Sequence, residues 1–273
     1  MENSGEVFAA DCDTGFATFY GNNPIEKTEC DYSKANQSLL DVDEVLAQNV
    51  AMIPIHPSGY FVTGSDTDVG KTYITCELIR QLALFKLNLE VRKPAESGCE
   101  ASASGEMIAA DGLKLQAANR RLETIDSITR FKYRAAVAPP RAAQIEGRCL
   151  LLNDLLGACA RDDCNSTLIV EGAGGFYSPL AEDGLNADLA CLLQLPVIIV
   201  INDKIGAVNQ ALLTIQAVGN SGLPIAAIIM NQAEEVKTAG MNNRQDLQAH
   251  CKLPIFGCGY NAALEPIFEV THG

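Results

Sequence analysis

The sequence predicts an α/β fold built on a doubly wound, mostly parallel sheet, and three observations support this prediction. From Gly59 onward, short apolar runs alternate with segments of helical periodicity. Two runs, PVIIVIN at 196–202 and IAAIIMN at 225–231, are apolar on both faces, which is typical of parallel strands covered by helices on each side. The first run of this region precedes a small polar loop that ends in Gly-Lys-Thr at 70–72 and opens a helical pattern.

Each expected strand is a short apolar run bounded by loop residues, and each expected helix carries apolar side chains at helical spacing. In chain order, the expected strands are 60–63, 90–93, 167–171, 196–202, 225–231 and 254–256. The expected helices between them are 71–85, 105–118, 151–161, 186–193, 207–221 and 241–251. This alternation of strands and helices is what a doubly wound sheet requires.

Composition narrows the class of protein. The 273 residues are 48% hydrophobic, yet no apolar run approaches the ~18 to 20 residues that cross a bilayer, so we expect a soluble protein without a membrane partner. A net charge of −14 argues against a nucleic-acid surface. The ten cysteines form no Cys-x-x-Cys pair, and the acidic start lacks the features of a signal peptide. Reduced thiols and a cytoplasmic location are therefore expected.

The first 58 residues differ from the rest of the chain. Residues 1–50 carry ten acids against two lysines, a net charge of −8 out of −14, and their periodicity is poor before a short helical pattern at 38–50. We expect residues 1–58 to be a weakly ordered acidic extension, with docking on the main domain as the alternative. Residues 59–273 are expected to form the P-loop α/β domain, and a chain that starts at Met52 would contain all of it.

The loop between the first strand and the first helix predicts a phosphate site, and hence a P-loop NTPase-like fold. Backbone N–H groups and the helix N-terminus would point at the anion, Lys71 would contact the outer phosphates, and the Thr72 hydroxyl would bind Mg²⁺. The match is a variant, because the first glycine stands at Gly64, one place earlier than usual. Asp66 and Asp68 are unusual in a loop for an anion.

Several expected strands end in a polar or charged residue. Lys93 follows one strand in RKPAESG, Glu171 ends another in TLIVEGAGG, and Asn202 and Asn231 end two more. Ligands bind at the carboxyl ends of strands in such sheets, so these residues are expected to meet at one site. An acid after an apolar strand is what a P-loop enzyme uses for its metal, although a capping or solvated glutamate would give the same pattern.

Five blocks, in this order and spacing, resemble dethiobiotin synthetase: GSDTDVGKT, KPAESG, EGAGGFYSPL, LPVIIVINDKIGAVNQALLT and IIMNQ. The resemblance covers about residues 59–257. It implies a homodimeric, ATP-dependent enzyme that converts 7,8-diaminononanoate and CO2 to dethiobiotin with MgATP, through a carbamate and its mixed anhydride with phosphate. A carbamate and a triphosphate are both anions, so bringing them together needs cations, which Lys71, Lys93 and Mg²⁺ would supply.

The resemblance also implies roles for individual residues. The implied catalytic residues are Lys71, Lys93, Thr67 and Ser97; the ATP-binding residues are Gly64, Ser65, Asp68, Val69, Gly70, Lys71, Thr72 and Asn231, the last at the adenine. The implied metal residues are Thr72, Asp111 and Glu171, and the implied substrate-binding residues are Ser97, Gly206, Ala207, Val208 and Asn209, the last four reaching the other subunit's site.

The chain departs from the family pattern in places. Gln210 replaces a frequent histidine, Asp203 adds an acid beside the expected carboxylate site, and Gly257-Cys258-Gly259-Tyr260 replaces an apolar-proline loop that contacts the nucleotide, which leaves the strictness of the ATP preference open. Three alternatives remain: a partition or septum-positioning type of regulatory P-loop ATPase, a cobyrinate-type amidotransferase-linked synthetase, and a noncatalytic binding module.

Overall fold

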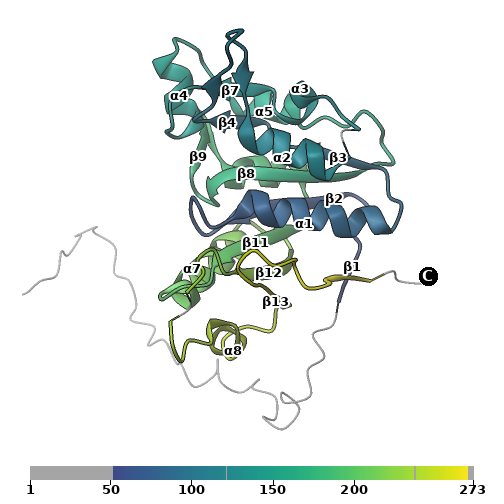
Figure 1. The fold of residues 1–273 in the computed structure, drawn as a ribbon, viewed down its shortest axis with the longest axis vertical. Coiled ribbons are helices and arrows are strands. Elements are labelled where there is room, and N and C mark those ends of the chain that lie inside the picture. Colours follow the sequence, from purple (N-terminus) through teal and green to yellow (C-terminus); the bar gives the residue numbers. More distant parts are fainter. Residues whose placement is uncertain (1–51, 121, 237, 270–273) are drawn as a thin grey trace, which may run out of the picture. The chain divides into compact units, whose positions relative to one another are not determined.

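The computed structural model describes residues 52–120, 122–236 and 238–269, which all belong to the compact unit Asn49–Gly273. Its main sheet has six strands in the order β13-β12-β11-β2-β8-β3, and all neighbouring pairs are parallel (Figure 1). The direction in which strands are added reverses at β2, which lies between β8 and β11, so the doubly wound prediction is confirmed. The strands are β2 Gly59–Gly64, β3 Leu89–Arg92, β8 Thr167–Gly175, β11 Val197–Asn202, β12 Ile225–Asn231 and β13 Ile255–Cys258.

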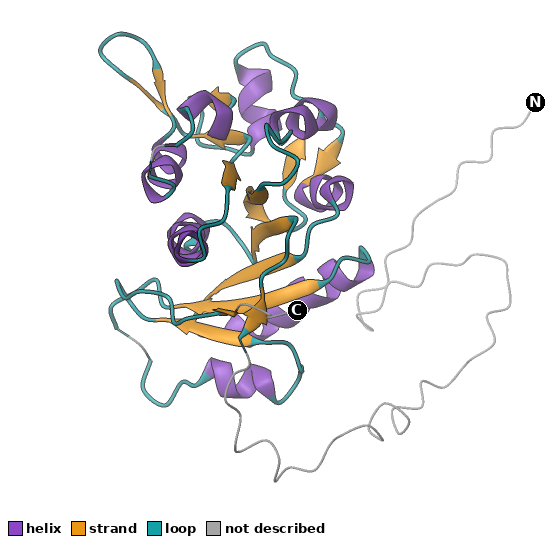
Figure 2. Ribbon diagram, turned by 90° about the vertical axis from the view of Figure 1, so that its right-hand side faces the viewer, coloured by secondary structure: helices purple, strands orange, loops and turns teal. Residues whose placement is uncertain are grey.

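Helices lie on both sides of this sheet (Figure 2), and in every strand except β3 the side chains enter two separate cores. In β2, for example, Phe61 belongs to one core and Val62 to the other, as the two-residue period of a strand requires. One core contains residues of α1 Lys71–Leu84, α2 Ala110–Ala118 and α3 Ile125–Ile128. The other contains residues of α4 Pro139–Ile145, α5 Leu152–Ala158, α6 Asn186–Leu193, α7 Ala207–Asn220 and α8 Asn243–Gln248.

All six expected strands are present, and three expected helices are shorter than predicted by more than one residue. The helix expected at 105–118 begins only at Ala110, because Gly105 has a positive φ of 84° and turns a small hairpin formed by β5 Glu100–Ala101 and β6 Met107–Ile108. The expected helices at 151–161 and 241–251 are reduced to α5 and α8. The short strand pairs β4 Ala95–Ser97 with β7 Phe131–Tyr133 and β9 Pro179–Ala181 with β10 Gly184–Leu185 were not predicted, nor were α3 and α4.

The described chain begins with β1 Ile53–Pro54, which pairs in parallel with β14 Phe268–Glu269. Ile53 is buried, so pairing and packing start within the stretch that the sequence analysis assigned to the extension. The helix expected at 38–50 lies outside the described residues.

The segment before β14 runs along helix α1. Gln81 Nε2 donates to the carbonyls of Leu264 at 3.1 Å and Glu265 at 3.0 Å, and its Oε1 accepts from Ile267 N at 3.1 Å. Near the start of the helix, Tyr73 Oη donates to the Ala262 carbonyl at 2.8 Å. Residues 262–267 are therefore attached to α1 along most of its length.

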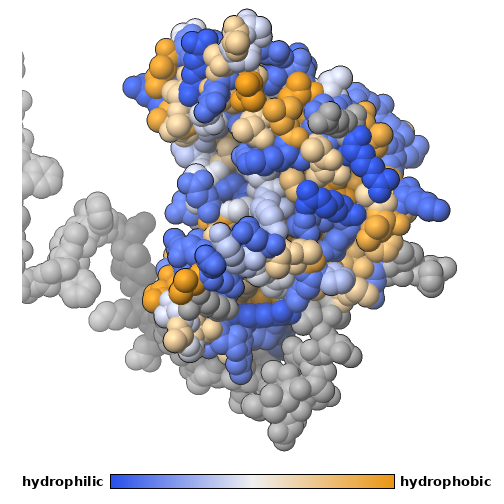
Figure 3. All heavy atoms as spheres, in the orientation of Figure 1, coloured by the Kyte–Doolittle hydropathy of each residue, from blue (hydrophilic) through white to orange (hydrophobic). Residues whose placement is uncertain are grey.

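Among the described residues, no helix has the length and apolar character needed to cross a membrane. Hydrophobic and hydrophilic residues are intermixed over the face seen in Figure 3. Scattered exposed apolar side chains of this kind are normal on a folded domain.

Candidate functional site

The phosphate loop joins β2 to α1 in a conformation that requires glycine at its end. Gly70 is the N-cap of α1 with φ 88°, a left-handed conformation that glycine adopts readily. A Cβ added there would lie 2.1 Å from Asn231 Nδ2. Gly64 is similarly close-packed, because its Cβ would lie 2.8 Å from the Asp66 carbonyl oxygen. The loop is thus held closely between the end of β2 and the end of β12.

Lys71 is buried beneath this loop. Its side chain is 7% exposed, and its Nζ donates to the Asp66 carbonyl at 2.9 Å. Burial lowers the pKa of the Lys71 ammonium to about 8, against the opposing attraction of the Glu171 carboxylate. Within the described part of the chain Lys71 forms no ion pair, so its charge is available to an anion in the loop.

Glu171 lies at the centre of a charged cluster beside the start of α1. Its Oε1 accepts from Thr72 Oγ1 at 2.7 Å and from Lys93 Nζ at 2.6 Å, and Lys93 Nζ also lies 3.2 Å from Asp111 Oδ2. Glu171 is 1% exposed and Lys93 is 5% exposed. Four residues from α1, α2, β8 and the end of β3 are therefore brought together, and two of them, Lys93 and Glu171, belong to the expected set of strand-end residues.

The pKa values of Lys93 and Asp111 are both shifted towards their charged forms. Burial by itself would lower the pKa of Lys93, but the Glu171 and Asp111 carboxylates outweigh burial and hold that pKa above its ordinary value. Burial likewise opposes the charge of Asp111, but Lys93 and Lys114 lower its pKa below the ordinary value. A permanent ammonium ion therefore stands between two carboxylates.

Glu171 Oε2 is the unusual atom of the cluster. It is buried and, within the described residues, has no hydrogen-bond partner. A buried carboxylate oxygen without a partner is costly, so such an atom in a native site calls for a ligand, an ion or water. Its position beside the Thr72 hydroxyl agrees with the role in metal binding that the resemblance implies.

The other expected residues of the loop differ in exposure, and Val69 is buried. Thr67 and Asp68 are exposed, Asp68 with a positive φ of 57°, and Ser65 is half-buried. The glycine-rich end of β8 lies against this loop, since a Cβ on Gly175 would be 3.1 Å from the Ser65 carbonyl oxygen and one on Gly174 would be 3.7 Å from Thr67 Oγ1. Small residues after Glu171 therefore permit close approach of the two loops, as the sequence indicated.

Ser97 ends the short strand β4, which follows Lys93 directly. It is half-buried and opposite Tyr133 of β7 in the pairing register. Ser97 belongs to the same segment as Lys93, which agrees with a place near the site. Its expected role at the carbamate stays a prediction.

Asn231 contacts the phosphate loop itself. It is 4% exposed, and its Nδ2 donates to the Val69 carbonyl at 2.9 Å. The side chain therefore braces the loop, whereas the resemblance implies a contact with adenine, which stays a prediction.

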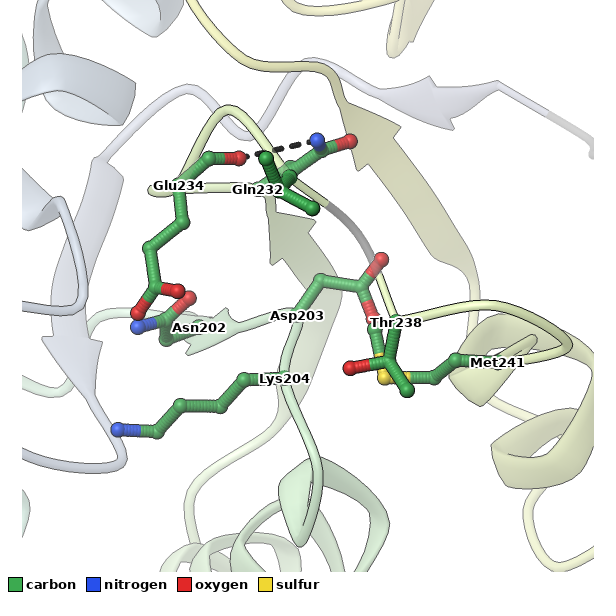
Figure 4. A pocket seen from close by; sticks show the side chains of 8 residues that line it. Asn202, Asp203, Lys204, Gln232, Glu234, Thr238 and Met241 are labelled. Carbon is green, nitrogen blue, oxygen red and sulfur yellow. Dashed lines mark hydrogen bonds between the residues drawn. The ribbon is translucent and has the colours of Figure 1, made fainter.

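A polar pocket lies beside Asn231, at the ends of β11 and β12 (Figure 4). Asn202 and Lys204 from the end of β11 face Glu234 from the loop after β12, where Gln232 Nε2 donates to the Glu234 carbonyl at 3.0 Å. Asp203, whose charge raised a question in the sequence, accepts from Asn243 Nδ2 at 2.8 Å and so contacts α8.

The expected carboxylate site lies at the start of α7. Gly206 is its N-cap with φ 88°, and no atom within 4 Å would obstruct a Cβ there. Gly206 and Asn209 are exposed, Val208 is half-buried and Ala207 is buried. The helix N-terminus is thus open on one side, as an anion site requires.

Sequence reasoning missed Glu96. Its two carboxylate oxygens accept from Asp111 N and Gly112 N, each at 2.9 Å. In the sequence, Glu96 is visible only as an acid three residues after Lys93. Its partners in α2 are evident only from the fold.

Comparisons with known proteins identify the family of this chain. A family model described as an AAA domain matches residues 58–262. The ATP-dependent dethiobiotin synthetase BioD of Ruthia magnifica is 40% identical over 72% of this chain and 89% of its own length. Its counterparts from Vesicomyosocius okutanii and Rhodopirellula baltica are 44% identical over 64% of this chain and 78% of theirs, and 32% identical over 72% and 81%, respectively.

A solved structure of the cell division protein FtsY from Thermotoga maritima is 14% identical, covers 82% of this chain and 70% of that one, and has a TM-score of 0.44. The residues matched by the family model include the phosphate loop, the Lys93 segment and the Glu171 strand, which together form the site described above. The chain therefore belongs to the ATP-dependent dethiobiotin synthetase family.

Proposed function

We propose that this protein catalyses the ATP-dependent carboxylation and ring closure of 7,8-diaminononanoate to dethiobiotin. Family membership supports the reaction, and one observation carries it at the level of the site. Thr72, Lys93 and Glu171 converge within hydrogen-bonding distance directly beside Lys71, so cations and a metal-binding acid lie together at the phosphate loop.

The residues present fit a magnesium ion. Thr72 offers a hydroxyl, Glu171 offers its unpartnered buried oxygen, and Asp111 offers a carboxylate. In residues 52–120, 122–236 and 238–269 no three His, Cys, Asp or Glu side chains form a metal site by themselves, so phosphate oxygens and water would complete the shell, as is usual for Mg²⁺. When bound, Mg²⁺ would neutralise charge on the transferring phosphoryl group.

Lys71 and Lys93 would stabilise the two anions of the reaction, the carbamate and the triphosphate. One neutral amine of the substrate forms a C–N bond to CO2 and loses a proton, giving a carbamate. A carbamate oxygen then bonds to the γ-phosphorus as the bond to ADP breaks, and the second amine displaces phosphate to close the ring. Lys93, charged and buried, would hold the carbamate, and Lys71 would stabilise the phosphoryl group during transfer.

The wider assignment rests on the same proposal. The synthetase domain would comprise residues 59–273 together with β1 at Ile53–Pro54, and the acidic extension would end before β1. The protein would work in the cytoplasm as a homodimer, in which Gly206 to Asn209 at the start of α7 receive the substrate's distant carboxylate from the partner's site. The open helix N-terminus supports that use.

Phosphate release with MgATP, bicarbonate and the diamine, with each omitted in turn, tests the reaction, and mass spectrometry identifies the product. We expect release only with all three and formation of dethiobiotin. Lys93→Ala should abolish turnover, and exposed Lys252→Ala is the matched control that should retain it. Phosphate release that ignores the diamine would support a regulatory ATPase instead.

A further inference from the structure

Glu96 makes contacts that no part of the proposed reaction uses. It lies in β4, three places after Lys93 in the sequence, and is 7% exposed. Its Oε1 accepts from Asp111 N and its Oε2 from Gly112 N, both at 2.9 Å. Both oxygens of a buried carboxylate are thus committed to the first turn of helix α2.

Helix α2 has no cap of its own that could take this place. The first N–H groups of a helix lack partners within it, and a side chain at the N-cap usually accepts from them. Here the N-cap is Ala109, and no side-chain cap is formed. A negative charge at this end is also favoured by the helix dipole. Glu96 therefore caps the helix from a different strand.

The contacts of Glu96 fix the position of the backbone at Asp111, the residue expected to bind the metal. Asp111 belongs to the first turn of α2, and its side chain lies 3.2 Å from Lys93 Nζ and 3.0 Å from Lys114 Nζ. On the other side, a Cβ on Gly112 would lie 2.4 Å from Thr129 Oγ1, so this turn packs closely against the residue that follows α3. The start of α2 is held between Glu96 and Thr129.

We propose that Glu96 is a positioning residue that sets the Asp111 carboxylate relative to Lys93 and Glu171, and through it the affinity of the site for a divalent cation with nucleotide. Lys93 and Glu96 belong to one short segment. This segment therefore places the Lys93 ammonium ion and, through Glu96, the start of α2 with the Asp111 carboxylate that faces Lys93. The inference rests on the proposed function of the site as a metal–nucleotide centre.

Binding of Mn²⁺ in the presence of the β,γ-imido analogue of ATP, measured by electron paramagnetic resonance, tests the proposal without turnover. In Glu96→Gln the amide keeps one acceptor but turns an N–H group towards a backbone N–H. We expect about a tenfold weaker Mn²⁺ affinity, the loss usual for residues that orient metal ligands. Glu100→Gln, on the exposed hairpin next to β4, is the matched control and should bind as wild type.

A double-variant comparison separates positioning from general loosening of the fold. If Glu96 acts through Asp111, Glu96→Gln should weaken Mn²⁺ binding little further once Asp111→Asn is present. In turnover assays, the KM for Mg²⁺ should rise more than kcat falls. If Glu96→Gln does not fold, the shorter Glu96→Asp replaces it with the same expected direction.

Unchanged Mn²⁺ affinity in a folded Glu96 variant, or an equal loss with and without Asp111, would overturn the proposal. Failure of the proposed function would give a different result: the wild-type protein would release phosphate whether or not the diamine is present. The binding comparison needs no diamine and remains readable in that case.

Discussion

Binding of ATP should draw a proton onto Lys71 when the pH is close to 8. In the free protein burial lowers the pKa of this lysine to about 8, so its side chain is about half protonated at that pH. A triphosphate next to Nζ favours the ammonium form and raises the pKa. We therefore expect an uptake of about 0.5 proton per nucleotide at pH 8 and about 0.1 at pH 7.

Lys93 and Asp111 do not add to this signal. Lys93 has a pKa above the ordinary value and Asp111 a pKa below it, so both keep their charges across this range. Calorimetric titrations with the ATP analogue, in two buffers that differ in their heat of ionisation, measure the number of protons taken up. The uptake should grow as the pH rises from 7 to 8.

Matched variants assign the proton to one residue. Lys71→Arg keeps a positive charge at all accessible pH values, so its binding should take up no proton, whereas exposed Lys252→Arg should behave as wild type. Proton release at pH 8, or the same uptake in Lys71→Arg as in wild type, would refute the reasoning.

Three other predictions follow from packing. Gly70→Ala should lose measurable nucleotide binding in an equilibrium assay, because its Cβ would lie 2.1 Å from Asn231 Nδ2; binding at wild-type strength would show that the loop can rearrange freely. Arg92→Met should lower the free energy of unfolding by ~3 to 5 kcal/mol, since Arg92 is 2% exposed and paired with two glutamates that would be left uncompensated, as urea titration would measure. A chain that starts at Met52 should stay folded and active, because the first described strand begins at Ile53; loss of soluble protein or of turnover would contradict this.

The sheet could be predicted because its strands are apolar on both faces. Runs such as 196–202 and 225–231 admit few other placements in an α/β domain, and they form β11 and β12. The paired short strands carry no such signal. β4 and β7 are three residues long, and β5 and β6 two, too short for a period to be read, so the segment before α2 was assigned to the helix.

The candidate site was predictable where residues follow strands. Lys93 directly follows β3, and Glu171 lies within β8 next to Val170, which pairs with Arg92, so parallel pairing of the two strands brings Lys93 and Glu171 together. The contacts of Asn231 and Glu96 are with segments elsewhere in the chain, and they depend on the direction in which each side chain points. Asn231 reaches back to Val69, and no local pattern shows that.

Helix α1 links the nucleotide loop to the end of the domain. It begins at Lys71, and at 14 residues it is a rod of about 21 Å. Tyr73 near one end and Gln81 near the other hold residues 262–267 along its side. A tilt of this rod when the loop closes on phosphate would carry that strip of chain with it, so protease cleavage or hydrogen exchange at 262–267 should report, from a distance, whether the loop is filled.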